Sequence, residues 1–222
     1  MYSTSDDPLE ITKFCKFSHT MIDQILNCRI HFQSLLILSL LDTLSKSVFP
    51  TNRNNRERFI TLLDRFSNWN YRQFVSLSQL DYLINNNSDL KSFLRAKINK
   101  YPDSVILRPE EADVSCDEIS KYCSTDELLL VEKARYVSLL WTLRNSLAHS
   151  FMPPGNGMAI SNNNSTPYYH ESMLKGHWDL YIHPQVLALI TRQTISNVAD
   201  YFESNGINPY ESFPWTSNWY EM

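Results

Sequence analysis

The residue types best suited to chemistry lie together at the end of a long apolar-periodic segment, Arg144-Asn145-Ser146-Leu147-Ala148-His149. This segment combines a permanent cation, an amide, a hydroxyl and an imidazole, and it stands just before Pro153, where a helix must end. A guanidinium matches phosphate oxygens with a planar fork, and a histidine that titrates near neutral pH can act as a general base. The motif therefore predicts a site that cleaves a phosphodiester bond.

Helical geometry limits how these groups can meet. Asn145 and His149 are four residues apart and share one helix face, whereas Arg144 and His149 point about 140° apart. Within one chain, either the helix distorts before Pro153, or the Arg144 side chain wraps around while Asn145 orients the imidazole. A second subunit packed across the same face would also bring these groups together. In the competing structural interpretation, His149 only caps the helix end and Arg144 pairs with an acidic neighbour.

Helical periodicity dominates the chain on both sides of the motif. It predicts helices over about 21–49 (ended by Pro50), over 51–66, 71–84 and 88–99, and from Ser124 into the motif. The last of these begins at a capping box, Ser124-Thr125-Asp126-Glu127. The residues predicted to be buried along it are Leu128, Leu129, Ala134, Val137, Leu140, Trp141 and Leu147.

Short strands are expected after the motif, over 158–160, 168–171 and 178–182, followed by a final helix over about Pro184–Glu203 that Gly206 stops. The predicted fold is mainly α: a helical bundle with a small β-hairpin or three-stranded appendage before the C-terminal helix. We expect one domain over 1–222, in which 100–123 is a loop or insertion and 206–222 is an aromatic tail.

The net charge of −4 is unevenly distributed. Residues 53–100 hold nine basic and four acidic side chains, and residues 101–132 hold two basic and nine acidic ones. The basic segment is either a solvated helix face or a phosphate-binding surface. On the second interpretation, Arg53, Arg56 and Arg58 are candidate substrate-binding residues, together with Ser146 of the motif.

Composition argues against several other classes of protein. The polar, acidic N-terminal residues do not resemble a signal peptide, and the apolar runs are too short to span a bilayer, so we expect a cytoplasmic protein without membrane contact. The cysteines and histidines show no metal-ligand spacing, so no metal is expected. Because the chain has only four glycines, neither a glycine-rich phosphate loop nor a Rossmann nucleotide site is expected, and we expect no cofactor.

The motif resembles the Arg-x(4–6)-His signature of the HEPN superfamily, including its usual polar residue directly after the arginine. The motif itself covers only Arg144–His149, and the similar bundle pattern covers about two thirds of the chain. The resemblance implies a metal-independent endoribonuclease that acts on RNA, with its site at a symmetric homodimer interface. His149 would be the general base on the ribose 2′-hydroxyl, Arg144 would bind the scissile phosphate, and Asn145 would position one of them. The implied products carry a 2′,3′-cyclic phosphate and a 5′-hydroxyl.

Proteins of this superfamily are frequently toxins or defence effectors. Those silenced by a partner nucleotidyltransferase often carry a tyrosine two residues after the histidine, where this chain has Phe151, so modification at that place is excluded. An antitoxin or effector partner of another kind stays open. Two other functions also stay open: a non-catalytic HEPN-like module that binds nucleotide, RNA or protein, and a helical adaptor that recruits a protein through its acidic segment 101–132 and its aromatic tail.

Overall fold

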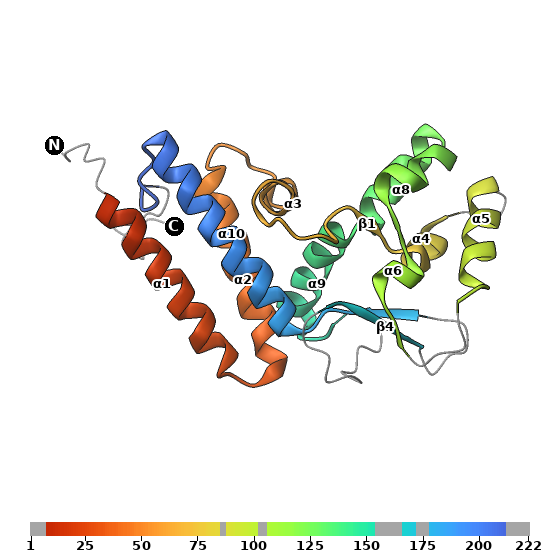
Figure 1. Cartoon of the computed structure of the whole chain (residues 1–222), viewed down its shortest axis with the longest axis horizontal. Helices are drawn as coiled ribbons and strands as arrows, with labels where there is room; N and C mark the ends of the chain where they lie inside the picture. Colours follow the sequence, from red (N-terminus) through yellow and green to blue (C-terminus); the bar gives the residue numbers. More distant parts are fainter. Residues whose placement is uncertain (1–7, 85–87, 102–105, 154–165, 172–177, 212–222) are drawn as a thin grey trace. The chain divides into compact units, whose positions relative to one another are not determined.

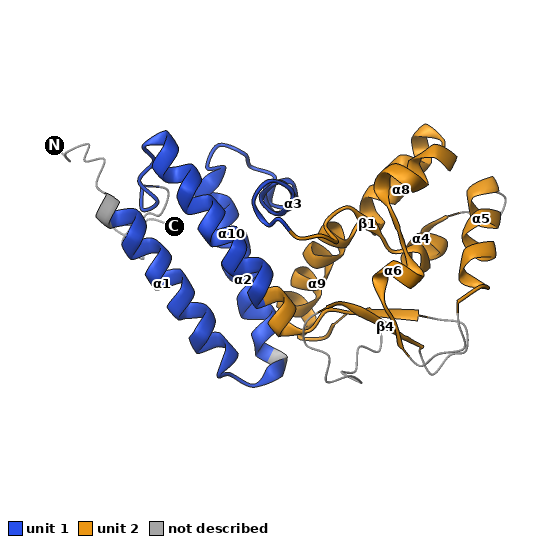
Figure 2. Ribbon diagram, viewed as in Figure 1, with its two compact units in different colours: residues 1–68, 188–222 blue, residues 69–187 orange. Residues whose placement is uncertain are grey.

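The computed structural model describes residues 8–84, 88–101, 106–153, 166–171 and 178–211. The chain, expected as a single domain, divides into two compact units (Figure 2). Unit 1 comprises residues 1–68 and 188–222, and unit 2 comprises residues 69–187. The motif belongs to unit 2, and each unit is described by itself.

Unit 1 is built from α1 (Pro8–Leu26), α2 (Ile30–Val48), α3 (Asn55–Phe66) and residues 188–205 of α10 (Pro184–Asn205) (Figure 1). Helices α1 and α10 run antiparallel, because the Phe14 ring meets that of Phe202 at 6.0 Å between centroids and Asp23 pairs with Arg192 at 2.5 Å. The buried core side chains come from all four helices: Phe14, Ile22, Ile37, Leu38, Leu41, Phe59, Leu62, Leu63, Ile195, Val198 and Phe202.

The prediction of one helix over 21–49 is wrong, because the chain turns back between α1 and α2 at residues 27–29. Gln33 on the first turn of α2 accounts for the break. Its side-chain amide donates to the carbonyls of Leu26, at 3.0 Å, and Cys28, at 2.9 Å. The Leu26 carbonyl is left without a helical partner at the end of α1, the Cys28 carbonyl belongs to the turn, and the amide satisfies both. The apolar periodicity continued across the turn because both helices bury residues in the same core.

We predict that Gln33→Glu lowers the free energy of unfolding by about 1–2 kcal/mol, because the carboxylate cannot donate to either carbonyl and is repelled by both. Urea denaturation measures the change. The matched control is Gln193→Glu, which removes one exposed side-chain hydrogen bond on α10 and should cost less than about 0.5 kcal/mol. Equal effects of the two substitutions would show that Gln33 does not fix the turn.

Unit 2 combines short helices with two small antiparallel sheets, β1–β3 and β2–β4–β5 (Figure 1). In chain order its elements are β1 (Phe74–Val75), α4 (Leu77–Leu83), α5 (Asp89–Ile98), β2 (Ile106–Leu107), α6 (Pro109–Ala112), β3 (Val114–Ser115), α7 (Cys116–Ile119), a 3-10 helix (Ser120–Tyr122), α8 (Thr125–Ala134), α9 (Tyr136–Ser150), β4 (Tyr168–Glu171) and β5 (Trp178–Tyr181). The predicted fold class, mainly helical with a three-stranded appendage before the C-terminal helix, is confirmed. The predicted strand over 158–160 and most of the aromatic tail lie outside the described residues.

The acidic segment is not the irregular loop that was expected, because residues 106–123 form β2, α6, β3, α7 and a 3-10 turn. Six carboxylates of the segment 101–132 lie in the first turn of α6, α7 or α8, where a negative charge interacts favourably with unpaired backbone N–H groups. Glu111 accepts from the Arg108 N–H at 2.7 Å at the start of α6. Glu127 accepts from the Ser124 N–H at 2.7 Å, which confirms the predicted capping box of α8. The acidic excess therefore serves short helices within the chain.

One carboxylate of this segment, Asp113, is the centre of a buried hydrogen-bond network in unit 2. Its Oδ1 accepts from the Leu77 N–H at 2.8 Å, at the first residue of α4. Its Oδ2 accepts from the hydroxyls of Tyr136 and Tyr169, each at 2.6 Å. Burial raises the pKa of Asp113 to about 7, against the opposite effect of these three donors. Because Tyr136 is the first residue of α9, the network anchors the start of the helix that carries the motif.

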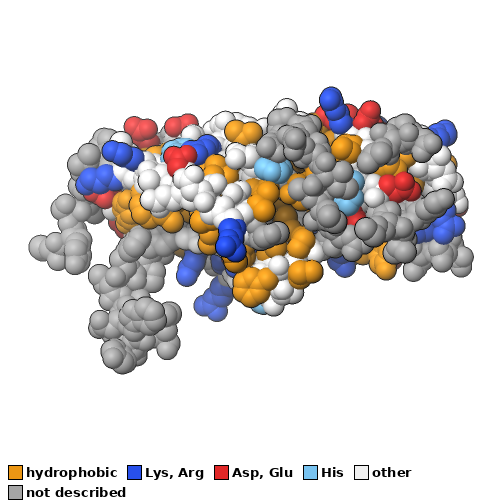
Figure 3. Space-filling view, turned by 90° about the horizontal axis from the view of Figure 1, so that it is seen from below, with side chains coloured by type: hydrophobic (Ala, Val, Ile, Leu, Met, Phe, Trp, Pro, Cys, Tyr) orange, Lys and Arg blue, Asp and Glu red, His pale blue; other side chains and the backbone are white. Residues whose placement is uncertain are grey.

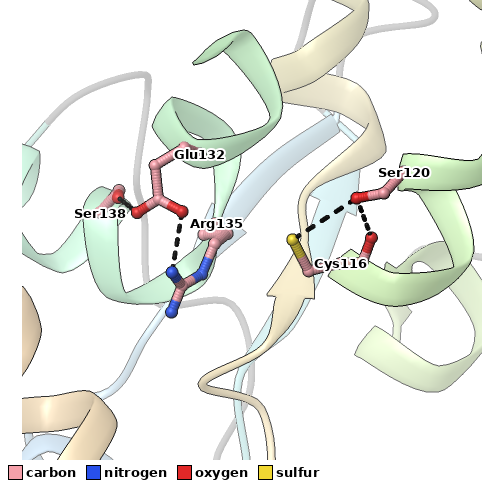
Figure 4. Close-up of polar contacts among 5 residues, drawn as sticks. All are labelled: Cys116, Ser120, Glu132, Arg135 and Ser138. Carbon is pink, nitrogen blue, oxygen red and sulfur yellow. Dashed lines mark hydrogen bonds and ion pairs between the residues drawn. The ribbon is translucent and has the colours of Figure 1, made fainter. Parts of the chain in front are cut away.

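Helices α8 and α9 are separate, contrary to the expectation of one continuous helix, because Arg135 between them has an extended backbone conformation. Glu132 spans the junction (Figure 4). One carboxylate oxygen of Glu132 pairs with Arg135 Nη1 at 2.8 Å, and the other accepts from the Ser138 hydroxyl at 3.4 Å. In the same view, the Ser120 hydroxyl donates to the Cys116 carbonyl at 2.6 Å and closes the short turn after β3.

The last helix, α10, begins and ends close to the predicted residues. The Nδ1 atom of His183 accepts from the Gln185 N–H at 3.1 Å and so caps the helix N-terminus. Burial lowers the pKa of His183, which favours the neutral imidazole that can accept this bond. At the other end, Gly206 takes a positive φ of 60°, and the Ile207 N–H donates to the Phe202 carbonyl at 2.9 Å. This is the left-handed ending that glycine favours.

Several large hydrophobic side chains are exposed on the described helices. In unit 1 they are Phe17 on α1, Ile30, Phe32 and Leu36 on α2, and Leu189 on α10. In unit 2 the prediction that Leu128 and Leu129 are buried is wrong, since their side chains are 41% and 67% exposed. Figure 3 shows hydrophobic side chains and charged side chains exposed together on one face. Among the described helices, none is long and apolar enough to cross a membrane.

Candidate active site at the end of helix α9

The whole motif lies on α9, which is helical from Tyr136 to Ser150. The buried side chains of this helix include Tyr136, Val137, Leu140 and Leu147. The backbone of Arg144–His149 is regular helix, so the distortion considered for this segment does not occur. Arg144 and His149 therefore leave the helix in directions about 140° apart.

The Arg144 guanidinium is held from two sides. Its carbon lies 5.3 Å from the centre of the Trp141 ring, one turn earlier on α9. Its Nη1 donates to the Asn145 side-chain oxygen at 3.0 Å. The three side chains are half-buried, and the ring and the amide together restrict the guanidinium to a narrow range of positions. Asn145 thus contacts Arg144 and not the imidazole, although Asn145 and His149 share a helix face.

His149 is exposed, and no hydrogen bond joins its side chain to any residue in the described part of the chain. Two serines form the polar contacts at the helix end instead. The Ser146 hydroxyl donates to the Met152 carbonyl and the Ser150 hydroxyl donates to the Ser146 carbonyl, each at 2.6 Å. The imidazole of His149 is therefore left accessible to an incoming molecule.

The hydroxyl of Ser146 has a structural role in this arrangement, because its proton is used in the bond to Met152. The next residue after the helix, Phe151, has a left-handed backbone conformation with φ of 55°. Its N–H still donates to the Leu147 carbonyl at 3.1 Å. The motif thus ends in a turn that the Ser146 hydroxyl closes from within.

The other candidate substrate-binding residues, Arg53, Arg56 and Arg58, belong to unit 1. Arg53 is exposed and Arg56 is half-buried. Arg58 is only 8% exposed, and its Nη1 donates to the Asn52 carbonyl at 2.7 Å, so it braces the start of α3. Lys91 of the same basic segment is likewise buried, in unit 2, and pairs with Asp81 at 3.0 Å. The basic segment is therefore not one continuous cationic surface.

Trp141 is the site residue that sequence reasoning missed, because it was assigned to the buried stripe. It is half-buried and lies three residues before Arg144, the spacing at which helical side chains meet. That spacing, combined with the preference of guanidinium groups for indole faces, is the signal that could have identified it. The described residues contain no cluster of three or more histidine, cysteine or acidic side chains that could hold a metal ion.

Comparisons with family models, with curated proteins and with solved structures found no match to this chain.

Proposed function

We propose that the protein is a metal-independent endoribonuclease of HEPN type whose site is formed by Arg144 and His149 of α9. The observation that carries the proposal is the arrangement at the helix end. A guanidinium is held by Trp141 and Asn145, and an exposed imidazole follows on the next turn of the same helix. A held cation suits a phosphate, and an accessible imidazole suits proton transfer. The resemblance of the motif Arg144–His149 to the HEPN signature also supports a role as toxin or defence effector.

In the proposed reaction, neutral His149 takes the proton of a ribose 2′-hydroxyl. The 2′-oxygen attacks the adjacent phosphorus, the bond from phosphorus to the 5′-oxygen breaks, and that oxygen takes up a proton. Arg144 donates hydrogen bonds to the phosphate oxygens as negative charge accumulates on them. The products carry a 2′,3′-cyclic phosphate and a 5′-hydroxyl. The nucleophile belongs to the RNA, so the mechanism needs no metal ion.

We further propose that the complete site forms between two copies of the chain. Arg144 and His149 diverge on one regular helix, so a single flat face cannot present both to one phosphate. A two-fold axis beside α9 would place the Arg144 of each copy near the His149 of the other.

The direct test is incubation of the full chain with single-stranded RNA, and with DNA of the same sequence, in excess EDTA. We expect the RNA to be cleaved and the DNA to remain intact, because DNA lacks the 2′-hydroxyl. Cleavage of both, or cleavage that EDTA abolishes, would contradict the proposed mechanism.

A non-catalytic RNA-binding module is the second candidate, and one observation favours it. Arg144 is half-buried and already donates to Asn145, so part of its hydrogen-bonding capacity is used within the chain. On this alternative, RNA binds with a similar affinity to the wild-type protein and to His149→Ala, and its length does not change during incubation.

We predict that Trp141→Ala lowers kcat/KM for RNA cleavage by about 5- to 30-fold, the equivalent of about 1–2 kcal/mol for a cation–π contact that is partly removed from water. Trp141→Phe keeps an aromatic face under the guanidinium and should retain most of the activity. Steady-state cleavage of a fluorescent oligoribonucleotide measures both variants. If Trp141→Phe is as impaired as Trp141→Ala, the ring does not act by holding Arg144.

A further inference from the structure

The residue that ends α9 is unusual for its position. Phe151 has a φ of 55°, in the left-handed region where glycine or asparagine commonly ends a helix and where a residue with a Cβ atom is strained. The chain uses glycine at the equivalent position of α10, where Gly206 has a φ of 60°. Packing does not explain the choice of phenylalanine, because Phe151 is 69% exposed.

The neighbours of Phe151 indicate what its ring can contact. The Phe151 N–H donates to Leu147, so its Cα continues the helical path and lies on the same stripe as Arg144, about 10 Å further along the axis. The Cα of His149 is within about 7 Å, because only one residue separates them. The following side chain, Met152, is also 65% exposed. An exposed aromatic side chain therefore follows both groups at the end of the helix that carries them.

We propose that Phe151 is a base-stacking residue that selects unpaired nucleotides for the Arg144–His149 site. A nucleotide presents an anionic phosphate and an aromatic base, and the helix end offers a guanidinium for the first and an exposed ring for the second. Bases in a duplex are stacked on each other and cannot meet a protein ring, whereas splayed bases of single strands stack on aromatic side chains. The substrate class is therefore single-stranded or looped RNA. This inference rests on the proposed function, which identifies the ligand as RNA.

The Ser146 contact supports the assignment because it fixes the turn that exposes the ring. Its hydroxyl donates to the Met152 carbonyl, directly after Phe151, and so holds the left-handed turn in place. A preorganised ring costs less conformational entropy on binding than a mobile one. The strain at Phe151 then has a function: it keeps the aromatic ring in solvent beside the site.

The test uses the full chain with His149→Ala, which removes the proposed base so that RNA is bound without being cut. In this background Phe151→Gly, Phe151→Leu and Phe151→Trp are compared by fluorescence anisotropy with a single-stranded oligoribonucleotide and with its duplex. We expect about a 10-fold loss of single-strand affinity for Phe151→Gly and Phe151→Leu, retained affinity for Phe151→Trp, and no change in duplex affinity. The unfolding midpoint of Phe151→Gly should be unchanged or raised by up to about 4 °C, because glycine relieves the strained turn.

Sedimentation velocity on the same variants separates RNA stacking from a protein interface. Loss of an oligomer in Phe151→Gly would overturn the proposal. Equal single-strand affinity of all variants would also overturn it, as would a failure of His149→Ala with Phe151 unchanged to bind RNA. Phe151-dependent binding together with an absence of cleavage by the wild-type chain would support the stacking role while contradicting the ribonuclease proposal. The two failures are therefore distinguishable.

Discussion

Asp113→Ala is expected to lower the free energy of unfolding by about 3–5 kcal/mol, because it removes the acceptor of three buried donors, of which only the Tyr169 hydroxyl has a second acceptor, Ser76 Oγ. These donors are the Leu77 N–H and the hydroxyls of Tyr136 and Tyr169. Asp113 is only 7% exposed and the two tyrosines are fully buried, so water does not replace the lost contacts. The matched control is Asp117→Ala, an exposed carboxylate in the first turn of α7, which should cost less than about 1 kcal/mol.

The same network predicts a pH dependence of stability. Burial raises the pKa of Asp113 from its ordinary value to about 7, so the folded state binds a proton more readily than the unfolded state. The stabilisation linked to this proton is fully present below about pH 4 and is lost as the pH rises through about 7. Asp113→Asn, which stays neutral, should remove this dependence. The stability of the wild type relative to Asp113→Asn should therefore fall between pH 4 and 8, by at most about 1.4 kcal/mol per pH unit.

Equilibrium urea denaturation followed by circular dichroism at several pH values measures both effects. A small loss in Asp113→Ala, comparable with that of Asp117→Ala, would show that the network contributes little to unit 2. Parallel pH profiles of the wild type and Asp113→Asn would show that the Asp113 carboxyl titrates at its ordinary pKa.

Arg144→Ala and His149→Ala are each expected to lower the rate of RNA cleavage by about 10²–10³-fold or more, because one removes the phosphate-binding cation and the other the base. The fold should tolerate both substitutions, since His149 is exposed and Arg144 is half-buried. Circular dichroism and thermal unfolding verify this. Arg95→Ala on α5 and His19→Ala on α1 remove the same side chains outside the motif and should leave cleavage within about 2-fold of the wild type.

Mixing the two inactive variants tests whether the site is shared between copies. If each site combines Arg144 of one copy with His149 of the other, a mixed dimer holds one intact site. An equimolar mixture should then recover about a quarter of the wild-type activity. If both groups act within one copy, the mixture stays inactive. If Arg144→Ala or His149→Ala alone cleaves RNA at nearly the rate of the wild type, the substituted residue has no role in the mechanism.

The parts of the fold that could be predicted from the sequence are those where local chemistry fixes an element. The capping box at Ser124, the extent of α10 and its stop at Gly206 were predicted and are confirmed. The turn between α1 and α2 could not be predicted, because it depends on hydrogen bonds from the Gln33 side chain on α2 to backbone carbonyls at and after the end of α1. Apolar periodicity continues through such a turn whenever both helices bury the same core.

Tertiary contacts account for the differences in the acidic segment. Its charge indicated a solvated loop, but Glu111 and Glu127 cap short helices and Asp113 is buried among hydroxyls. Asp113 receives its donors from residues 23 to 56 positions away in sequence, a separation that no local pattern can show. The net charge of this segment therefore did not indicate its structure, which consists of short helices and strands and not of a loop.

At the candidate site, the sequence predicted the helix and the divergence of Arg144 and His149, and the structure has both. It did not decide which neighbour Asn145 would contact, because Arg144 and His149 are both within reach of its side chain. The contact with Arg144 follows from the bend of the long arginine side chain over Trp141. The left-handed turn at Phe151 could not be foreseen either, since phenylalanine is not a residue that favours it.

The most direct test of the central claim, that Arg144 and His149 form a phosphodiester-cleaving site, is the chemistry of the cleaved ends. The full chain is incubated in excess EDTA with an end-labelled single-stranded RNA, and the product termini are identified by mass spectrometry. The account predicts a 2′,3′-cyclic phosphate and a 5′-hydroxyl in the wild-type reaction, and neither product with Arg144→Ala or His149→Ala. Products with a 3′-hydroxyl and a 5′-phosphate, or the same cyclic products from folded His149→Ala, would contradict it.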